Sequence, residues 1–354
     1  MKILSLQKKP DRSLHGKLTT FLLATLVALS ACSGNNNTSS TPIPLPNGQA
    51  GSLITSNGNP ADCFATTTAS ALTPCSGSTT SANGSNGVTA LNTFVSSSGP
   101  GIVVGTSNGV VSVVNSVYSS SPPVVPCTAL TSPISAVAVA GTNIFAAVGS
   151  TLYEFSGGTS SCSSPSSTPI GSGPITGLGV DTTSGTLFGV TNSGSYFSIA
   201  NASTVQSLST SSLATPPNTP LTPLPNYPVS GPNINGMAID PNGLVFFADA
   251  STNTPNNGGQ ITIYHVSNSN GNTISPNNVQ SYSGNNNGVA MSDPIGIAVS
   301  ETTVTNSNYC STAPCDYIYL LNIGNSIQQY VMPVPNPNNG GVSINPLMLG
   351  PETG

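Results

Sequence analysis

The chain has 354 residues, including 37 Gly and 31 Pro but no Trp, and only 4% of its residues are charged. This length suits one large all-β domain or two small domains, and the frequent Gly and Pro argue against long helices. All five basic residues lie at or before Lys17, so the remaining chain has no Lys or Arg patch with which to bind nucleic acid.

The first predicted element is an apolar segment from Leu18 to Leu29, which follows the basic residues. It is too short to span a membrane comfortably and is typical of a secretory signal. The next residues, Leu29-Ser30-Ala31-Cys32, resemble the lipobox of bacterial lipoproteins. The resemblance implies that residues 1–31 are removed and that Cys32 is acylated; an ordinary signal peptide with a nearby Cys is the alternative.

Residues 32–48 then form a low-complexity tether that cannot bury a core, with Cys32 as its lipid anchor. Ser33 follows the Cys where an Asp would favour the inner membrane, so the resemblance implies an outer-membrane location in a bacterial cell envelope. Without residues 1–31 the chain keeps nine of its ten acidic residues, since only Asp11 is lost, and one His, so its formal side-chain charge is −9. These carboxylates cannot form salt bridges, and each needs water, backbone N–H groups or a metal.

A sequence motif of alternating small and apolar residues recurs five times between residues 88 and 354. Its small residues are spaced by 46, 41, 59 and 60 positions, which is close to the period of a four-stranded propeller blade. The motif predicts the first strand of each repeat at Val88–Phe94, Ile134–Val139, Ile175–Asp181, Ile234–Asp240 and Pro294–Val299.

Two further apolar runs follow each copy of the motif and predict a second and a third strand. A Ser/Thr/Pro-rich stretch comes next and suits a weaker outer strand. The second strands are expected at Gly101–Thr106, Asn143–Gly149, Thr186–Thr191, Leu244–Ala250 and Asp316–Asn322. The third are expected at Gly109–Asn115, Thr151–Phe155, Gly194–Ile199, Gln260–Val266 and Ser326–Met332.

The clearest copy runs Ile234-Asn-Gly-Met-Ala-Ile-Asp240-Pro-Asn-Gly243-Leu-Val-Phe-Phe-Ala-Asp249. It resembles the NHL-type repeat and the related gluconolactonase-like propellers. The resemblance implies an all-β fold, a β-propeller of five four-stranded blades. A sixth blade is the alternative, because the segment 49–87 contains candidate strands at Ser52–Ser56 and Phe64–Thr68. A further alternative is that these strands close the ring beside the C-terminal strand around Val342–Leu349. A β-sandwich or a solenoid is the competing fold.

Six Cys follow Cys32, and an exported protein is expected to pair them as disulfides. Fifteen pairings are formally possible. Proximity favours Cys63 with Cys75 and Cys310 with Cys315, which leaves Cys127 with Cys162 across adjacent blades. A zinc site at Cys310 and Cys315 is the weaker alternative, because no second ligand pair accompanies them.

The carboxylates are the best candidates for a chemical site. The gluconolactonase-like resemblance implies a divalent cation on the propeller axis, for which Glu154, Asp249, Asp293 and Glu301 are the candidate ligands and Ca²⁺ is the expected ion. Against this, Asp181 and Asp240 stand in Asp-to-Gly turns, where an Asp side chain caps its own backbone, and the repeat resemblance gives Asp249 a structural hydrogen-bonding role. His265 has no Asp or Ser context and is expected to be a strand-end residue rather than a catalytic base.

We therefore expect a lipid-anchored extracytoplasmic propeller, without a cofactor, that acts as a binding or scaffold module for a protein or glycan partner and contacts the membrane through Cys32. The alternative is a Ca²⁺-dependent hydrolase similar to lactonases or to strictosidine synthase.

Overall fold

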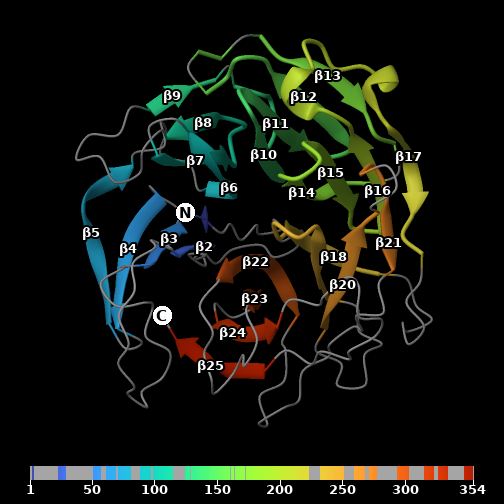
Figure 1. Ribbon diagram of the computed structural model, residues 1–354. Helices are drawn as coiled ribbons and strands as arrows, with labels where there is room; N and C mark the ends of the chain where they lie inside the picture. Colours follow the sequence, from blue (N-terminus) through green and yellow to red (C-terminus); the bar gives the residue numbers. More distant parts are fainter. Residues whose placement is uncertain are drawn as a thin grey trace, which may run out of the picture.

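The computed structural model places antiparallel, mostly four-stranded sheets in a propeller arrangement around a common centre (Figure 1). It describes residues 2–3, 23–28, 51–56, 61–68, 71–80, 88–96, 99–114, 124–127, 129–159, 161–162, 164–171, 173–222, 232–250, 259–267, 271–276, 293–302, 315–322, 326–333 and 347–353. Of the strands before residue 88 the backbone alone is described. The predicted all-β class is thus confirmed.

Each of the five sequence repeats forms one four-stranded sheet, with its strands in chain order from the centre outward. The innermost strands are β6 (Val88–Ser96), β10 (Ala136–Ala140), β14 (Ile175–Asp181), β18 (Ile234–Ile239) and β22 (Pro294–Thr302). The second strands are β7 (Gly99–Thr106), β11 (Asn143–Val148), β15 (Thr186–Thr191), β19 (Leu244–Asp249) and β23 (Cys315–Asn322). The third are β8 (Val111–Val114), β12 (Thr151–Phe155), β16 (Ser195–Ile199), β20 (Gln260–Val266) and β24 (Ser326–Pro333). These positions confirm the predicted strands to within a few residues.

The outermost strands are short, and Pro limits most of them. They are β9 (Val124–Pro126), β13 (Ser166–Pro169), β17 (Thr215–Pro220), β21 (Ile274–Pro276) and β25 (Leu347–Thr353). The first four end at a Pro, which has no N–H to offer to a further strand. The predicted Ser/Thr/Pro-rich outer strands are therefore present, and their composition protects the open edge of each sheet.

The N-terminal residues form a sheet of their own, β1 to β5. Its strands are β1 (Lys2–Ile3), β2 (Leu23–Ala28), β3 (Gly51–Ser56), β4 (Ala61–Thr68) and β5 (Ala71–Thr80). Among the described residues β3 and β4 pair within this sheet and β25 pairs with β24, whereas residues 342–346 of the expected C-terminal strand lie outside the described residues. The strands β1 and β2 come from the segment expected to be a signal peptide, and both contact β6 and β22.

The alternation of small and large residues in the innermost strands gives every sheet two different faces. On the innermost strands of the repeats, the face toward the next sheet in chain order, here called the leading face, carries mainly small residues, and the face toward the preceding sheet, the trailing face, carries mainly large ones. A Cβ placed on Gly177 of β14 would lie 2.7 Å from Met237 Cβ of β18, and one on Gly179 would lie 3.1 Å from Ile239 Cγ1. The small residues of the innermost strand thus receive the large side chains of the neighbouring sheet.

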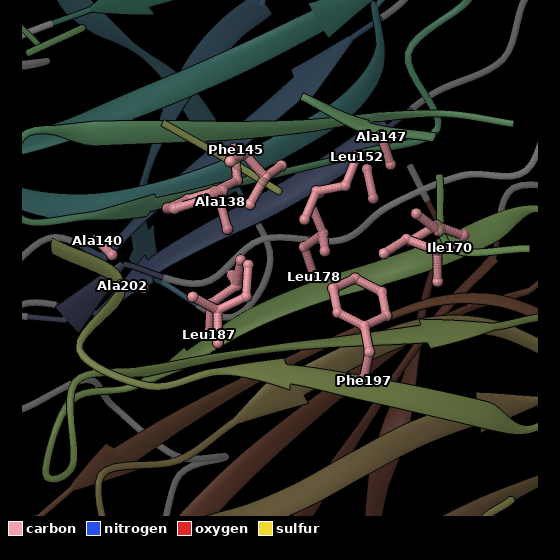
Figure 2. Packing of buried hydrophobic residues seen from close by; sticks show 14 residues of the cluster. Ala138, Ala140, Phe145, Ala147, Leu152, Ile170, Leu178, Leu187, Phe197 and Ala202 are labelled. Atoms are coloured by element: carbon pink, nitrogen blue, oxygen red, sulfur yellow. The ribbon is translucent and has the colours of Figure 1, made fainter. Parts of the chain in front are cut away.

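The core lies between consecutive sheets and follows these faces. Between the second and third repeats, Phe145 and Leu152 point toward Leu178 and Phe197 (Figure 2). All four side chains are buried to within 1% of their surface. Equivalent clusters fill the seams on either side. Burial of apolar surface in the seams, rather than inside any one sheet, stabilises the arrangement.

Side-chain hydrogen bonds fasten the beginnings of the innermost strands to one another. Thr89 Oγ1 donates to the carbonyl of Ile134 at 2.7 Å, and Thr176 Oγ1 donates to that of Ile234 at 2.8 Å. Asn235 Nδ2 repeats the contact with the carbonyl of Pro294 at 3.0 Å. In each case the donor precedes the first small residue of one repeat, and the acceptor lies two positions before that of the next. The innermost strands therefore begin at the same end of the molecule.

Candidate functional site

The molecule has two ends on which a site could be built. We call the end where the innermost strands begin the entry end, and the end where each innermost strand turns into its second strand the hairpin end. The register of each sheet assigns the candidate residues to these ends.

Asp181 and Asp240 lie in the turns of the hairpin end and act as predicted, by capping backbone N–H groups. Asp240 Oδ1 accepts from the N–H groups of Asn242 at 2.9 Å and Leu244 at 2.6 Å. Asp181 accepts from the N–H groups of Thr183 and Ser184 at 3.0 and 3.2 Å. Both aspartates are buried. These hydrogen bonds stabilise the two turns.

Asp249 ends β19 at the entry end and is fully buried. Its Oδ1 accepts from the backbone N–H of Asn233 at 2.9 Å, and its Oδ2 accepts from Gln260 Nε2 at 2.9 Å. The structural role expected for Asp249 is confirmed by these contacts, which join the beginnings of β18 and β20 to the end of β19.

Asn235 and Asp293 lie at the same entry end as Asp249. Asn235 lies at the register shift between the Ile234–Asp249 and Gly236–Ala248 pairs, and its Nδ2 donates to the carbonyl of Pro294. Its Oδ1 is buried without a hydrogen-bond partner among the described residues. Asp293 immediately precedes Pro294 and has a left-handed φ of 44°.

Glu154 lies in β12, the third strand of its sheet, toward the hairpin end, and only 1% of it is exposed. Ser156 Oγ donates to its Oε1 at 2.7 Å, and Ser166 Oγ donates to its Oε2 at 2.8 Å. Ser166 Oγ also accepts from the N–H of Leu208 at 2.7 Å. The carboxylate therefore fastens the outer part of one sheet to a loop of the next.

The four metal candidates do not share one end of the ring. Glu154 and Glu301 lie toward the hairpin end, where Glu301 pairs with Asp316 in the β22–β23 register, whereas Asp249 and Asp293 lie at the entry end. Glu301 is described through its backbone alone. Among the described residues no group of three His, Cys, Asp or Glu side chains is placed to hold a metal ion.

His265 lies in β20 on the same face as the buried Ile261 and Ile263, as the alternation predicts, and it faces the seam toward β22. Its Nδ1 is buried without a partner among the described residues. Burial lowers the pKa of His265 below 6.5, and a hydrogen bond with the backbone of Ser275 partly opposes this. Partial burial therefore favours the neutral imidazole.

Two tyrosines are held protonated in the seam between the third and fourth repeats. Burial raises the pKa of Tyr264, and the charge of Asp249 adds to the effect. The Tyr264 hydroxyl donates to the carbonyl of Thr222 at 3.1 Å. Burial also raises the pKa of Tyr196, whose oxygen accepts from the N–H of Ile274. Both phenols serve packing and hydrogen bonding.

One of the three expected disulfides lies within the described side chains and is confirmed. Cys127 is bonded to Cys162, with their Cα atoms 5.0 Å apart, and the bond joins adjacent sheets as expected. Cys127 directly follows β9, the fourth strand of its sheet. Cys63 and Cys75 lie in the neighbouring strands β4 and β5, and Cys315 begins β23, but these side chains lie outside the described residues, as do Cys32 and Cys310.

A surface of neutral polar residues covers the hairpin end over the second to fourth repeats. It surrounds two short 3-10 helices, η1 (Ala202–Thr204) and η2 (Thr210–Ser212). We call it the hydroxyl-rich face, and its exposed members are Thr142, Thr182, Thr183, Asn201, Ser203, Thr204, Gln206, Ser207, Ser209, Thr210, Ser211 and Asn242. Asn143 anchors η1 to β11 through hydrogen bonds from Nδ2 to the carbonyls of Ala202 at 3.1 Å and Val205 at 2.6 Å.

The sequence analysis missed Asn92, which lies at the centre of the ring. It stands where the other repeats have Gly or Ala, and its Nδ2 donates to the carbonyls of Val137 at 2.9 Å and Leu178 at 3.3 Å. It thereby links the innermost strands of three successive sheets. The one signal in the sequence is the polar residue at a small-residue position of the repeat.

No protein-family model matches the chain, and no curated protein matches it. Among solved structures, the chain is similar to the crystal structure of the computationally designed Ika8 protein, with 10% sequence identity and a TM-score of 0.41, over 79% of this chain and 67% of that one. The propeller arrangement rests on the chain's own sheet topology. Within the described part of the chain, no helix has the length and apolar character needed to cross a bilayer.

Proposed function

We propose that the chain is a lipid-anchored, non-enzymatic propeller that binds a protein or glycan partner in the bacterial cell envelope, and that the hydroxyl-rich face is its contact surface. The observation that carries this proposal is the use of the ionisable side chains. Asp181, Asp240, Asp249 and Glu154 all accept hydrogen bonds that hold turns, strands or loops together. What the exposed hairpin end offers is an array of neutral hydroxyl and amide groups fixed on rigid sheets.

The anchoring part of the proposal rests on the sequence. Removal of residues 1–31 and acylation of Cys32 would tether the ring through residues 32–48, in our proposal at the outer membrane. Mass spectrometry of the protein purified from its native envelope should find an N-terminal Cys32 carrying acyl chains, and Cys32→Ser should abolish acylation. An intact Met1 in the envelope-bound protein would contradict the proposal.

The blade number is also part of this proposal. We infer that the five repeat sheets are five blades, since each has the same strand order and the same leading and trailing faces.

The contact surface can be tested by photo-crosslinking in cells. A photoreactive residue at Ser207, on the hydroxyl-rich face, should give a discrete crosslinked partner, whereas the same residue at Pro220, exposed on the outer strand β17, should not. Crosslinks from Pro220 alone would place the contact surface on the outer edge of the sheets. Crosslinks from neither position would contradict a binding role for this face.

A further inference from the structure

The N-terminal sheet lies between the sheets of the first and the fifth repeat (Figure 1). Its strand β2 contacts the innermost strands β6 and β22, as an innermost strand at this place in the ring would. β3 pairs with β2 on one side and with β4 on the other. If residues 1–31 are removed, as proposed above, β2 is lost, and β3 keeps no partner on its inner side among the described residues.

The inner edge of β3 would then need a new strand. Backbone N–H and C=O groups that are buried without partners are costly, and an unpaired strand edge attracts any strand that can reach it. This edge lies beside the innermost strands and not at the outer rim, so a strand from another protein would have to enter the ring. The segment that directly precedes β3 is already attached to it, which gives that segment a high effective concentration at the edge.

The residues before β3 have the sequence of a hairpin turn. Leu45-Pro46-Asn47-Gly48-Gln49 places a Pro at the second position of a type I turn and a Gly at the fourth. A type I turn followed by a left-handed Gly is a common three-residue loop of β-hairpins, with a G1 bulge at the Gly. The turn therefore predicts that the chain before Leu45 runs antiparallel to β3, with Leu45 opposite Gln49.

The prolines before this turn are spaced as an edge strand requires. In an antiparallel strand, the N–H groups of successive residues point to opposite sides. Leu45 begins the turn, so Ile43 and Thr41 direct their N–H groups toward β3 as Leu45 does. Pro42 and Pro44 then face the open side, where no donor is needed. Since a residue that precedes a Pro is also restricted to extended conformations, the segment is suited to pair on one side only.

We propose that residues 38–45 take the place of β2 in the processed chain, an inference that rests on the removal of residues 1–31 proposed above. In this register Thr38 lies opposite Ser56. The strands 38–45, β3, β4 and β5 then follow one another from the centre outward in chain order, as in every repeat. The first two are joined by a short turn, like the two residues between β10 and β11, whereas 22 residues separate β2 from β3.

This strand decides how the ring stands on the membrane. Only residues 32–37 remain as a spacer between the acylated Cys32 and the ring, and six residues reach about 20 Å at most. Because the innermost strands begin at the entry end, the anchor leaves the ring there. The hydroxyl-rich face lies at the opposite, hairpin end and therefore points away from the membrane, toward a partner.

Paired cysteines test the new strand in the full-length chain expressed in its own host, where processing takes place. Ser40 and Ile54 form a directly opposite, non-hydrogen-bonded pair in the proposed register, for which a Cα separation of about 4.5 Å suits a disulfide. We expect Ser40→Cys/Ile54→Cys to form the bond after processing. In the uncut chain carrying Cys32→Ala the bond should be lost, because Ile54 pairs there with Thr25 of β2.

The matched control is Ser40→Cys/Leu53→Cys, which is shifted by one residue, places the two thiols on opposite faces and should not form the bond. Gly48→Val should abolish the Ser40→Cys/Ile54→Cys bond, because a β-branched residue does not adopt the left-handed conformation of the turn. Gly34→Val, in the spacer, should leave the bond unchanged. Peptide mapping identifies each bond, and formation of the Cys127–Cys162 bond verifies the fold of every variant.

The inference is overturned if the two cysteine pairs form bonds equally, if neither does, or if the uncut chain forms the Ser40→Cys/Ile54→Cys bond to the same extent. The N-terminal mass of the same sample separates the two levels of the account. Retention of Met1 contradicts the anchoring together with the strand, whereas an N-terminal Cys32 without the bond contradicts the strand alone.

Discussion

At the scale of single residues, the repeat depends on side-chain size more than on chemistry. Gly177 has room for no side chain, because an added Cβ would lie 2.7 Å from Met237 Cβ and 3.0 Å from the backbone N of Met237. The backbone atom cannot move out of the way without shifting β18. The glycine is therefore required by the neighbouring sheet and not by a turn.

We predict that Gly177→Ala lowers the free energy of unfolding by about 1–3 kcal/mol, the usual cost of overpacking a core. Gly179→Ala is the matched control and should cost less, because its added Cβ would meet the side-chain ends Ile239 Cγ1, Ile239 Cδ1 and Met237 Cε at 3.1–3.3 Å. Urea unfolding of the two variants checks this order. Equal losses, or a larger loss for Gly179→Ala, would count against the packing of leading on trailing faces.

His265 makes the stability of the folded protein depend on pH. Its pKa is below 6.5 in the folded protein because burial disfavours the charged imidazole. The unfolded chain therefore binds a proton more readily, so the stability that the neutral imidazole contributes is present above pH 6.5 and is lost as the pH falls below it.

We predict that the thermal midpoint falls between about pH 6.5 and pH 5 and that His265→Asn removes this part of the fall. Carboxylates titrate mainly below this window, so the variant isolates the histidine. Scanning calorimetry of both proteins at several pH values measures the difference. Parallel pH profiles for the two proteins would show that His265 is not the group responsible.

The sequence could predict some residue roles and not others. Asp181 and Asp240 were predictable because an Asp three or four residues before a Gly caps a turn through local contacts alone. Asn92 and Asn235 were not, because their partners lie in other sheets, and no local spacing reveals contacts between residues 45 or 59 positions apart. The position of Glu154 also depended on the arrangement of whole sheets.

At the scale of elements, the outer strands show how the sheets keep their open edges from pairing. β9, β13, β17 and β21 each end at a Pro. In β13, Pro169 is exposed, pairs with Thr151 of β12 and has no N–H to donate to a further strand. Edge strands with free donors and acceptors are templates for pairing between molecules.

We predict that Pro169→Val leaves the fold intact but increases concentration-dependent self-association, because it adds an N–H donor and a β-branched side chain to the edge. Ser167→Val is the control: it adds the same side chain at an exposed position of the same strand and keeps the Pro. Light scattering coupled to size-exclusion chromatography compares the two. Association of Ser167→Val to the same extent would show that apolar bulk, and not the Pro, is decisive.

At the scale of the whole molecule, the regular alternation in sequence predicted most strands closely, since period 2 and turn residues are local signals. The arrangement of the N-terminal residues was not predictable in the same way. β1 and β2 pair across a long sequence gap, and β2 pairs in turn with β3, so no local sequence signal reveals their partners. The repeated motif likewise did not predict that Asp249 and Glu154 lie toward opposite ends of the ring.

The central claim is that this ring is a binding module whose acidic residues serve structure. The thermal midpoint of the mature protein in EDTA and in millimolar Ca²⁺ tests it most directly, because a cation bound to the folded state alone must raise that midpoint. We predict the same midpoint in both conditions. A rise with Ca²⁺ that disappears in Asp249→Asn or in Asp293→Asn would contradict the claim and would identify the entry end as the metal centre of a cation-dependent enzyme.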